Sequence, residues 1–112
     1  MLENYHDGIF SLESVVQKTS HNVAQRFAIA DRGFIREGYY ADLVLVDVEQ
    51  SHVATRSNSL SRCGWTPFDG YRFRSVITST LVNGQLVWHE GKLRDVESVG
   101  MALKYDRLAA NP

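Results

Sequence analysis

An apolar run framed by aspartates constrains the fold of this chain more than any other feature. Residues 43–46, Leu-Val-Leu-Val, stand between Asp42 and Asp47, and Gly38 precedes them as a turn residue. Aliphatic and β-branched residues favour strands, four residues are few for a helix, and aspartate disfavours strand interiors. We therefore expect a strand here that is covered on both faces. Asp42 is interpreted as a turn aspartate that bonds backbone amides, with a catalytic carboxylate as the alternative.

The pair Asn83-Gly84 lies between two runs of alternating residues, 76–82 and 85–90. An Asn-Gly pair favours a type I′ turn, which needs positive φ at both central positions. The sequence therefore predicts a β-hairpin. Residues 71–77 also alternate and predict a strand, and residues 93–99 are a candidate for one more short segment.

A helical pattern precedes these strands. Its apolar residues recur three, four and seven positions apart: Leu12, Val15, Val16, Val23, Ala24 and Phe27. Ser11 is placed to cap the helix, and Glu13 lies favourably in the first turn. Because Asn22 is a candidate second N-cap, we expect two consecutive helices, at residues 12–19 and 23–27.

Two connecting stretches complete the pattern. Residues 30–38 predict a short extended element between turns, and residues 49–67 predict a long polar loop with a brief strand near His52. Loops of that length are often functional or mobile. The loop ends in the stretch from Cys63 to Gly70. We expect the aromatic cluster of Trp65, Phe68, Tyr71 and Phe73 to pack the loop onto the sheet, with ligand stacking as the alternative.

Helices followed by strands predict an α+β fold: N-terminal helices, then a small, mainly antiparallel sheet or half-sandwich. The 112 residues suffice for one domain with a core. The net charge of −1 gives no reason to expect a nucleic acid or an anionic membrane as a partner. With no apolar stretch near the roughly 20 residues of a membrane span and no signal peptide, we expect a soluble cytoplasmic protein.

The residues that carry most catalytic chemistry are scattered. The four histidines, His6, His21, His52 and His89, show no metal-ligand spacing, and no Gly-x-Ser-x-Gly elbow or phosphate-binding loop is present. Cys63 is the only cysteine, so no internal disulfide forms, and we interpret it as a small buried hydrophobe rather than a nucleophile. We assign no catalytic or metal-binding residue, and expect structural roles for Asp42, Trp65, Pro67, Phe68, Asn83 and Gly84.

Four stretches nevertheless occur in an order familiar from one enzyme family: Ser20 to Phe27, Arg32 to Asp47, Cys63 to Gly70, and Val76 to Gly84 with its return strand. Together they resemble the C-terminal end of the bacterial dihydroorotases, of the amidohydrolase superfamily. The Trp-Thr-Pro-Phe part favours dihydroorotase over dihydropyrimidinase and allantoinase, which share the other motifs. Val23 stands where the family usually has a proline.

The resemblance implies a zinc-dependent parent enzyme that interconverts N-carbamoyl-L-aspartate and dihydroorotate in pyrimidine synthesis. Its metal ligands, a His-x-His, a carboxylated lysine, two histidines and an aspartate, would lie on a (β/α)8 barrel upstream of residue 1. A barrel needs at least ~200 residues, so this chain cannot contain one. It would be a catalytically silent C-terminal fragment that holds no zinc itself.

On this resemblance, residues 1–29 would be the closing helices of the barrel, residues 30–107 the C-terminal part of a small β-sandwich, and residues 108–112 a frayed tail. The expected partners are the missing barrel part and, through exposed apolar surface, further copies of the chain. Three alternatives stay open: a β-rich interaction module, a scaffold subunit related to dihydroorotase and, within the family, a fragment of a dihydropyrimidinase or allantoinase.

Overall fold

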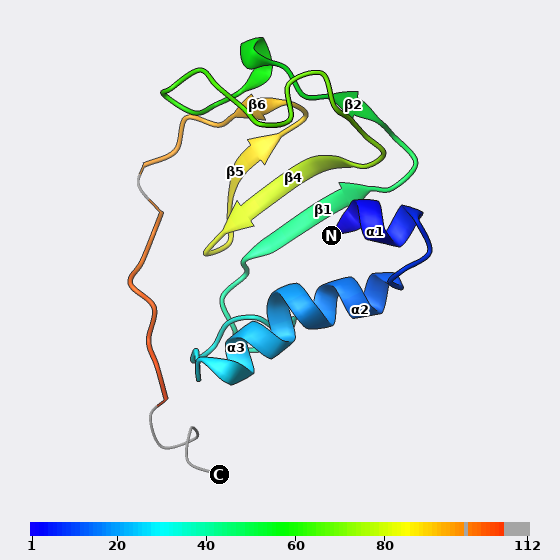
Figure 1. Cartoon of the computed structure of the whole chain (residues 1–112). Helices are drawn as coiled ribbons and strands as arrows, with labels where there is room; N and C mark the ends of the chain where they lie inside the picture. Colours follow the sequence, from blue (N-terminus) through cyan, green and yellow to red (C-terminus); the bar gives the residue numbers. More distant parts are fainter. Residues whose placement is uncertain (98, 107–112) are drawn as a thin grey trace.

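The computed structural model describes residues 1–97 and 99–106, in which helices come first and strands follow (Figure 1). This order confirms the predicted α+β fold. The predicted tail at residues 108–112 lies outside the described residues. The elements are α1 (Leu2–His6), α2 (Leu12–Val16), a π-helical turn (Gln17–His21), α3 (Asn22–Arg26), β1 (Leu43–Asp47), β2 (His52–Val53), a 3₁₀ turn (Arg56–Asn58), β3 (Arg72–Phe73), β4 (Val76–Val82), β5 (Gln85–His89) and β6 (Lys92–Leu93).

The stretch from α2 to α3 is one continuous helical segment. The Ser11 hydroxyl accepts from the Ser14 amide at 3.2 Å, which confirms the predicted cap. The predicted second N-cap is wrong, because Asn22 has helical dihedrals, φ −63° and ψ −34°. Val23 keeps the backbone N–H that a proline would lack, so the helix continues. The predicted break corresponds instead to the π-helical turn, where the Thr19 hydroxyl donates to the Val15 carbonyl at 2.8 Å.

The segment between α3 and β1 contains no strand, so the extended element predicted around residues 34–35 is wrong. The chain turns here because its backbone passes directly against the helix. Gly33 has a φ of 83°, its carbonyl accepts from the Ser20 hydroxyl at 3.2 Å, and a Cβ added to it would lie 2.4 Å from the Cβ of Ala24. Glycine is the residue that fits this approach.

The strands form a four-stranded antiparallel sheet in the order β1-β4-β5-β6, and β2 pairs with β3 in a separate two-stranded sheet. Both the predicted strand at residues 43–46 and the predicted hairpin are confirmed. Asn83 and Gly84 have φ values of 49° and 81°, as a type I′ turn requires. The strand predicted for residues 71–77 is interrupted between β3 and β4, where Arg74 and Ser75 bond other partners.

The sheet is open on both faces at β1. Side chains of Val44 and Leu45 point to opposite faces, and they are 55% and 51% exposed. The expectation that both faces are covered therefore fails within this chain. Among the described apolar residues, only Val15 and Ala24 are buried. None of the described helices is long and apolar enough to cross a membrane.

Candidate functional site

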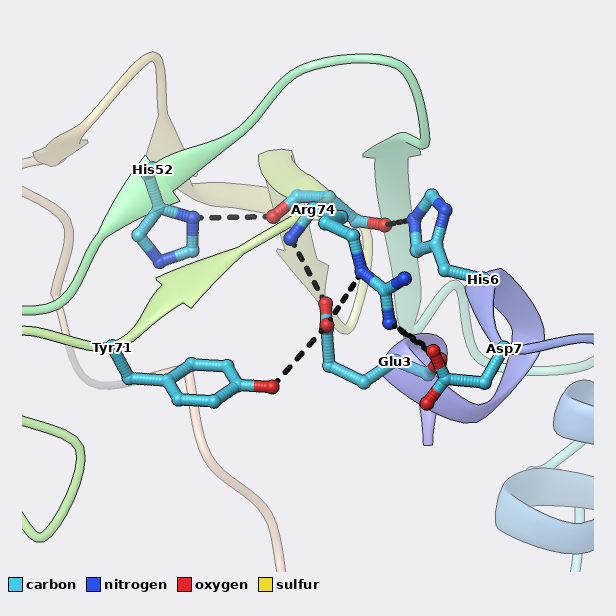
Figure 2. Close-up of polar contacts among 7 residues, drawn as sticks. Glu3, His6, Asp7, His52, Tyr71 and Arg74 are labelled. Carbon is cyan, nitrogen blue, oxygen red and sulfur yellow. Dashed lines mark hydrogen bonds and ion pairs between the residues drawn. The ribbon is translucent and has the colours of Figure 1, made fainter.

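The densest group of polar contacts joins the first helix to the sheet (Figure 2). We call this group the helix–sheet joint. Its residues come from α1 and the residue after it, from β2, and from the segment around β3 up to the start of β4: Glu3, His6, Asp7, His52, Tyr71, Arg74 and Ser75.

Arg74 makes most of the contacts in the joint. Its Nε donates to Glu3 Oε2 at 2.9 Å, and its Nη2 donates to the Glu3 carbonyl at 3.1 Å and to Asp7 Oδ1 at 2.6 Å. Its backbone N–H donates to Glu3 Oε1 at 2.9 Å, because Arg74 lies between two strands and its amide is free of the ladder. The hydrogen bonds to Asp7 and Glu3 raise the pKa of Arg74. One residue thus holds both acidic side chains near the N-terminus.

Glu3 is the acceptor shared by two segments. Besides Arg74, the Tyr71 hydroxyl donates to Glu3 Oε2, at 3.4 Å. The hydrogen bond from the Arg74 amide is the largest cause of a lowered pKa for Glu3; the Arg74 side chain and its charge add to it, and partial burial opposes it. Glu3 is therefore held as a carboxylate.

Ser75 forms the neutral half of the joint. Its hydroxyl lies 2.8 Å from His6 Nε2, and its carbonyl accepts from His52 Nδ1 at 3.1 Å, so that nitrogen of His52 carries a proton. The His52 ring also stacks on Phe73, with centroids 5.3 Å apart. A serine beside a histidine is the geometry of an activated nucleophile. Ser75 is only 6% exposed, however, so its hydroxyl is not accessible to a substrate. Its contact with His6 attaches the helix to the sheet instead.

The structure brings three of the predicted site residues together around an arginine that the sequence did not indicate. Asp42 Oδ1 accepts from the Asn83 amide at 2.8 Å, and the Gly84 amide donates to the Ala41 carbonyl at 3.0 Å. Arg32 forms an ion pair with Asp42 and donates to Asn83 Oδ1 at 2.7 Å.

The Arg32 side chain is only 10% exposed, and its guanidinium lies 4.1 Å from the centre of the Tyr40 ring. The side-chain amide of Asn83 also donates to the Val99 carbonyl. The predicted turn residues therefore belong to a polar cluster that ties the hairpin to segments on either side of it.

The other three predicted residues lie in a loop that we call the aromatic loop, residues 54–71. Its neck is closed by bonds from the Ala54 amide to the Tyr71 carbonyl, at 2.9 Å, and from the Gly70 amide to the Ala54 carbonyl, at 2.8 Å. Phe68 packs edge-on against Phe73 with centroids 5.4 Å apart. Trp65 and Pro67 are exposed, Trp65 to 59%.

Cys63, in the same loop, is exposed, so its interpretation as a buried hydrophobe is wrong. The loop turns it outward, where a hydrogen bond with the Ser61 hydroxyl lowers the pKa of its thiol.

The described residues do not fit a resident metal ion. Over residues 1–97 and 99–106, no group of three or more histidine, cysteine, aspartate or glutamate side chains could hold one. Each histidine has another contact: His6 and His52 bond Ser75, His89 Nδ1 lies 2.9 Å from the Ser79 hydroxyl, and His21 stacks on Phe34. The histidines therefore serve packing and hydrogen bonding in this part of the chain.

Comparison with known proteins shows which proteins the chain is similar to. No family model matches the chain. A dihydroorotase from Pyrococcus furiosus is 28% identical over 93 residues, 83% of this chain and 22% of the relative. An allantoinase from Desulfitobacterium hafniense is 33% identical over 89 residues, 80% of this chain and 20% of the relative.

Among solved structures, the L-hydantoinase (dihydropyrimidinase) from Arthrobacter aurescens aligns with a TM-score of 0.77 and 28% identity over 84% of this chain and 21% of its own. The chain is homologous to the cyclic amidohydrolases. A D-hydantoinase, with a TM-score of 0.74 and 23% identity, shares the fold. This amidohydrolase homologue spans about a fifth of the length of the relatives it matches. Dihydroorotases, allantoinases and hydantoinases all match it at similar identity, so the comparisons establish homology to this group of proteins and do not single out one of its members.

Proposed function

We propose that this chain is the C-terminal, non-catalytic structural part of a dihydroorotase. The observation that carries the proposal is the open sheet. The chain exposes 8762 Å², whereas a compact monomer of 12.7 kDa exposes roughly 6,200 Å². Its radius of gyration is 16.1 Å, against about 13 Å for a compact chain of this length. The open sheet and the described residues after β6, which form no strand (Figure 1), both contribute to this excess, which supports a part that another part covers.

The exposed apolar residues lie where covering is needed. On β1, Val44 and Leu45 leave both sheet faces open. Along the helical segment, Leu12, Val16, Val23 and Phe27 are exposed at spacings of four, seven and four residues, which is one helical face. In the proposal that face closes the barrel, and the sheet is its share of a flanking β-sandwich. The barrel part, outside these residues, carries the zinc ligands.

Dihydroorotase is preferred over the related activities because of the aromatic loop. Its sequence Trp65-Thr-Pro-Phe-Asp-Gly70 resembles the corresponding loop of dihydroorotases. A dihydroorotase is also among the relatives found by sequence. The proposed parent reaction is the reversible ring closure of N-carbamoyl-L-aspartate to dihydroorotate.

A second candidate function is favoured by the tip of the same loop. Leu60 and Trp65 are 65% and 59% exposed in a loop that is closed at its neck by backbone bonds. Ordered loops that present apolar groups are common interaction elements. The alternative is a β-rich interaction module that captures a partner protein through this loop.

Ring opening of four cyclic amides distinguishes these functions. Dihydroorotate, allantoin, dihydrouracil and hydantoin would each be supplied, with zinc, to the 112-residue chain and to the whole polypeptide that carries it in its source. We expect no turnover above the blank from the chain alone, and a kcat/KM of the whole polypeptide at least ~100-fold higher for dihydroorotate than for the others.

Turnover by the chain alone would contradict the structural role. If the whole polypeptide prefers another cyclic amide, the structural role of the chain stands but the dihydroorotase assignment is overturned. An inactive whole polypeptide would favour the interaction module.

A further inference from the structure

The helix–sheet joint connects two segments that lie far apart in the sequence, helix α1 and the aromatic loop. We propose that the joint couples them, with Glu3 as the shared acceptor, so that the helix and the loop are held in place or released together. The coupling does not depend on the function proposed above, because it follows from contacts within the chain.

Helix α1 depends on the joint for its position. It has five residues, no side-chain cap and no buried residue. Isolated helices shorter than about 12 residues are marginal in water, so the local backbone bonds of α1 do not by themselves make it stable. The bonds from Glu3, His6 and Asp7 to Arg74 and Ser75 are what attach it to the sheet. In this proposal the helix has two states, docked on the sheet or released from it.

The aromatic loop reaches the same joint through its neck. Tyr71 closes the neck with its carbonyl and bonds Glu3 with its hydroxyl. The Tyr71 ring also lies 4.7 Å from the Phe73 ring, which packs against Phe68. A shift of Tyr71 therefore moves both the loop neck and one donor to Glu3.

The Glu3 carboxylate, on helix α1, accepts hydrogen bonds from both Arg74 and the loop residue Tyr71. Oε1 accepts from the Arg74 amide, and Oε2 accepts from the Arg74 Nε and from the Tyr71 hydroxyl. Loss of the carboxylate charge weakens all three bonds at once, because hydrogen bonds to a charged acceptor are the stronger ones. By reciprocity, a ligand that holds the loop must also favour the docked helix.

Amide hydrogen exchange tests the coupling on the polypeptide as its source produces it. The indicator amides are those of Asp7 and Gly8 at the end of α1 and of Ala54 and Gly70 at the loop neck, all of which are bonded. We expect Glu3→Gln to raise exchange in both segments by similar factors, roughly tenfold.

The matched control is Arg72→Gln, which removes a cation from β3 whose described side-chain bond goes to Ser51, at 3.2 Å. It should leave α1 exchange unchanged. Faster exchange in α1 with an unchanged loop neck in Glu3→Gln would overturn the proposal, since the helix would then move alone.

A second variant keeps the test decisive where Glu3→Gln fails to fold. Tyr71→Phe removes the hydroxyl and keeps the ring against Phe73. Coupling predicts that exchange in α1 rises roughly threefold, although the change lies in the loop. Unchanged α1 exchange in this variant would contradict the coupling.

Discussion

At the scale of one residue, Gly33 and Gly38 test whether the close approach of the backbone to the helix contributes to the free energy of unfolding. Both have positive φ, 83° and 81°, but an added Cβ meets Ala24 at 2.4 Å only at Gly33, while Gly38 has open space around it. Gly38→Ala should cost about 1 kcal/mol from its φ alone, and Gly33→Ala about 2–4 kcal/mol because the helix must also move. Urea unfolding measures both; equal midpoints would disprove the packing argument.

Glu3 gives a prediction about pH. Its pKa is lowered in the folded protein, so its contribution to stability is present above the ordinary glutamate pKa and is lost as pH falls through the folded value. The urea midpoint should therefore fall between about pH 5 and about pH 3, and less steeply in Glu3→Gln.

Glu37→Gln provides the control, because Glu37 is an exposed carboxylate outside the joint. Its urea midpoint should fall with pH as steeply as that of the unmodified protein. If the urea midpoint falls equally steeply with pH in the unmodified protein, in Glu3→Gln and in Glu37→Gln, the joint does not depend on the Glu3 charge.

Local patterns made some residues predictable and left others hidden. Ser11 and the Asn83-Gly84 turn act through neighbours a few residues away, so the sequence indicated them. Glu3 meets Arg74 across 71 positions, and no local pattern reveals such a pair. Cys63 was misjudged because burial depends on how a long loop folds back.

At the scale of elements, Arg32 holds the hairpin turn in place. Arg32→Met keeps the alkyl stem but removes the bonds to Asp42 and Asn83, and leaves these groups without their cation. We expect a loss of about 2–3 kcal/mol in the free energy of unfolding. Arg36→Met, which removes a cation lying 4.2 Å from the centre of the Phe34 ring and 5.7 Å from that of the Tyr39 ring, should cost about 0.5–1 kcal/mol. Equal losses would show that the cluster adds nothing beyond stacking.

The sequence predicted the elements that have a strong short-range signal. It did not predict the short elements that contacts with distant residues hold in place. The strand β1 and the β4–β5 hairpin have apolar runs and a turn pair. Helix α1 has only five residues, without a periodic pattern, and depends on the joint. The helical break near Asn22 was expected as a cap but is a π-helical turn, because Val23 permits the helix to continue.

At the scale of the whole molecule, the chain exposes more surface than a compact protein of its size. We expect the isolated 112-residue chain to bind a hydrophobic dye and to associate as its concentration rises. The open sheet faces and the outer edge of β1, which no described strand pairs, favour such association. Sedimentation velocity measures the association. A monomer without dye binding at high concentration would contradict this expectation.

The most direct test of the structural role is the intact mass of the polypeptide that carries this sequence in its source. In the Pyrococcus furiosus relative, 93 aligned residues make up 22% of the protein, so that protein has roughly 420 residues. The account predicts a polypeptide of similar length in which a barrel with metal ligands precedes these residues. A mass of 12.7 kDa, the mass of this chain alone, in a compact folded protein would contradict it.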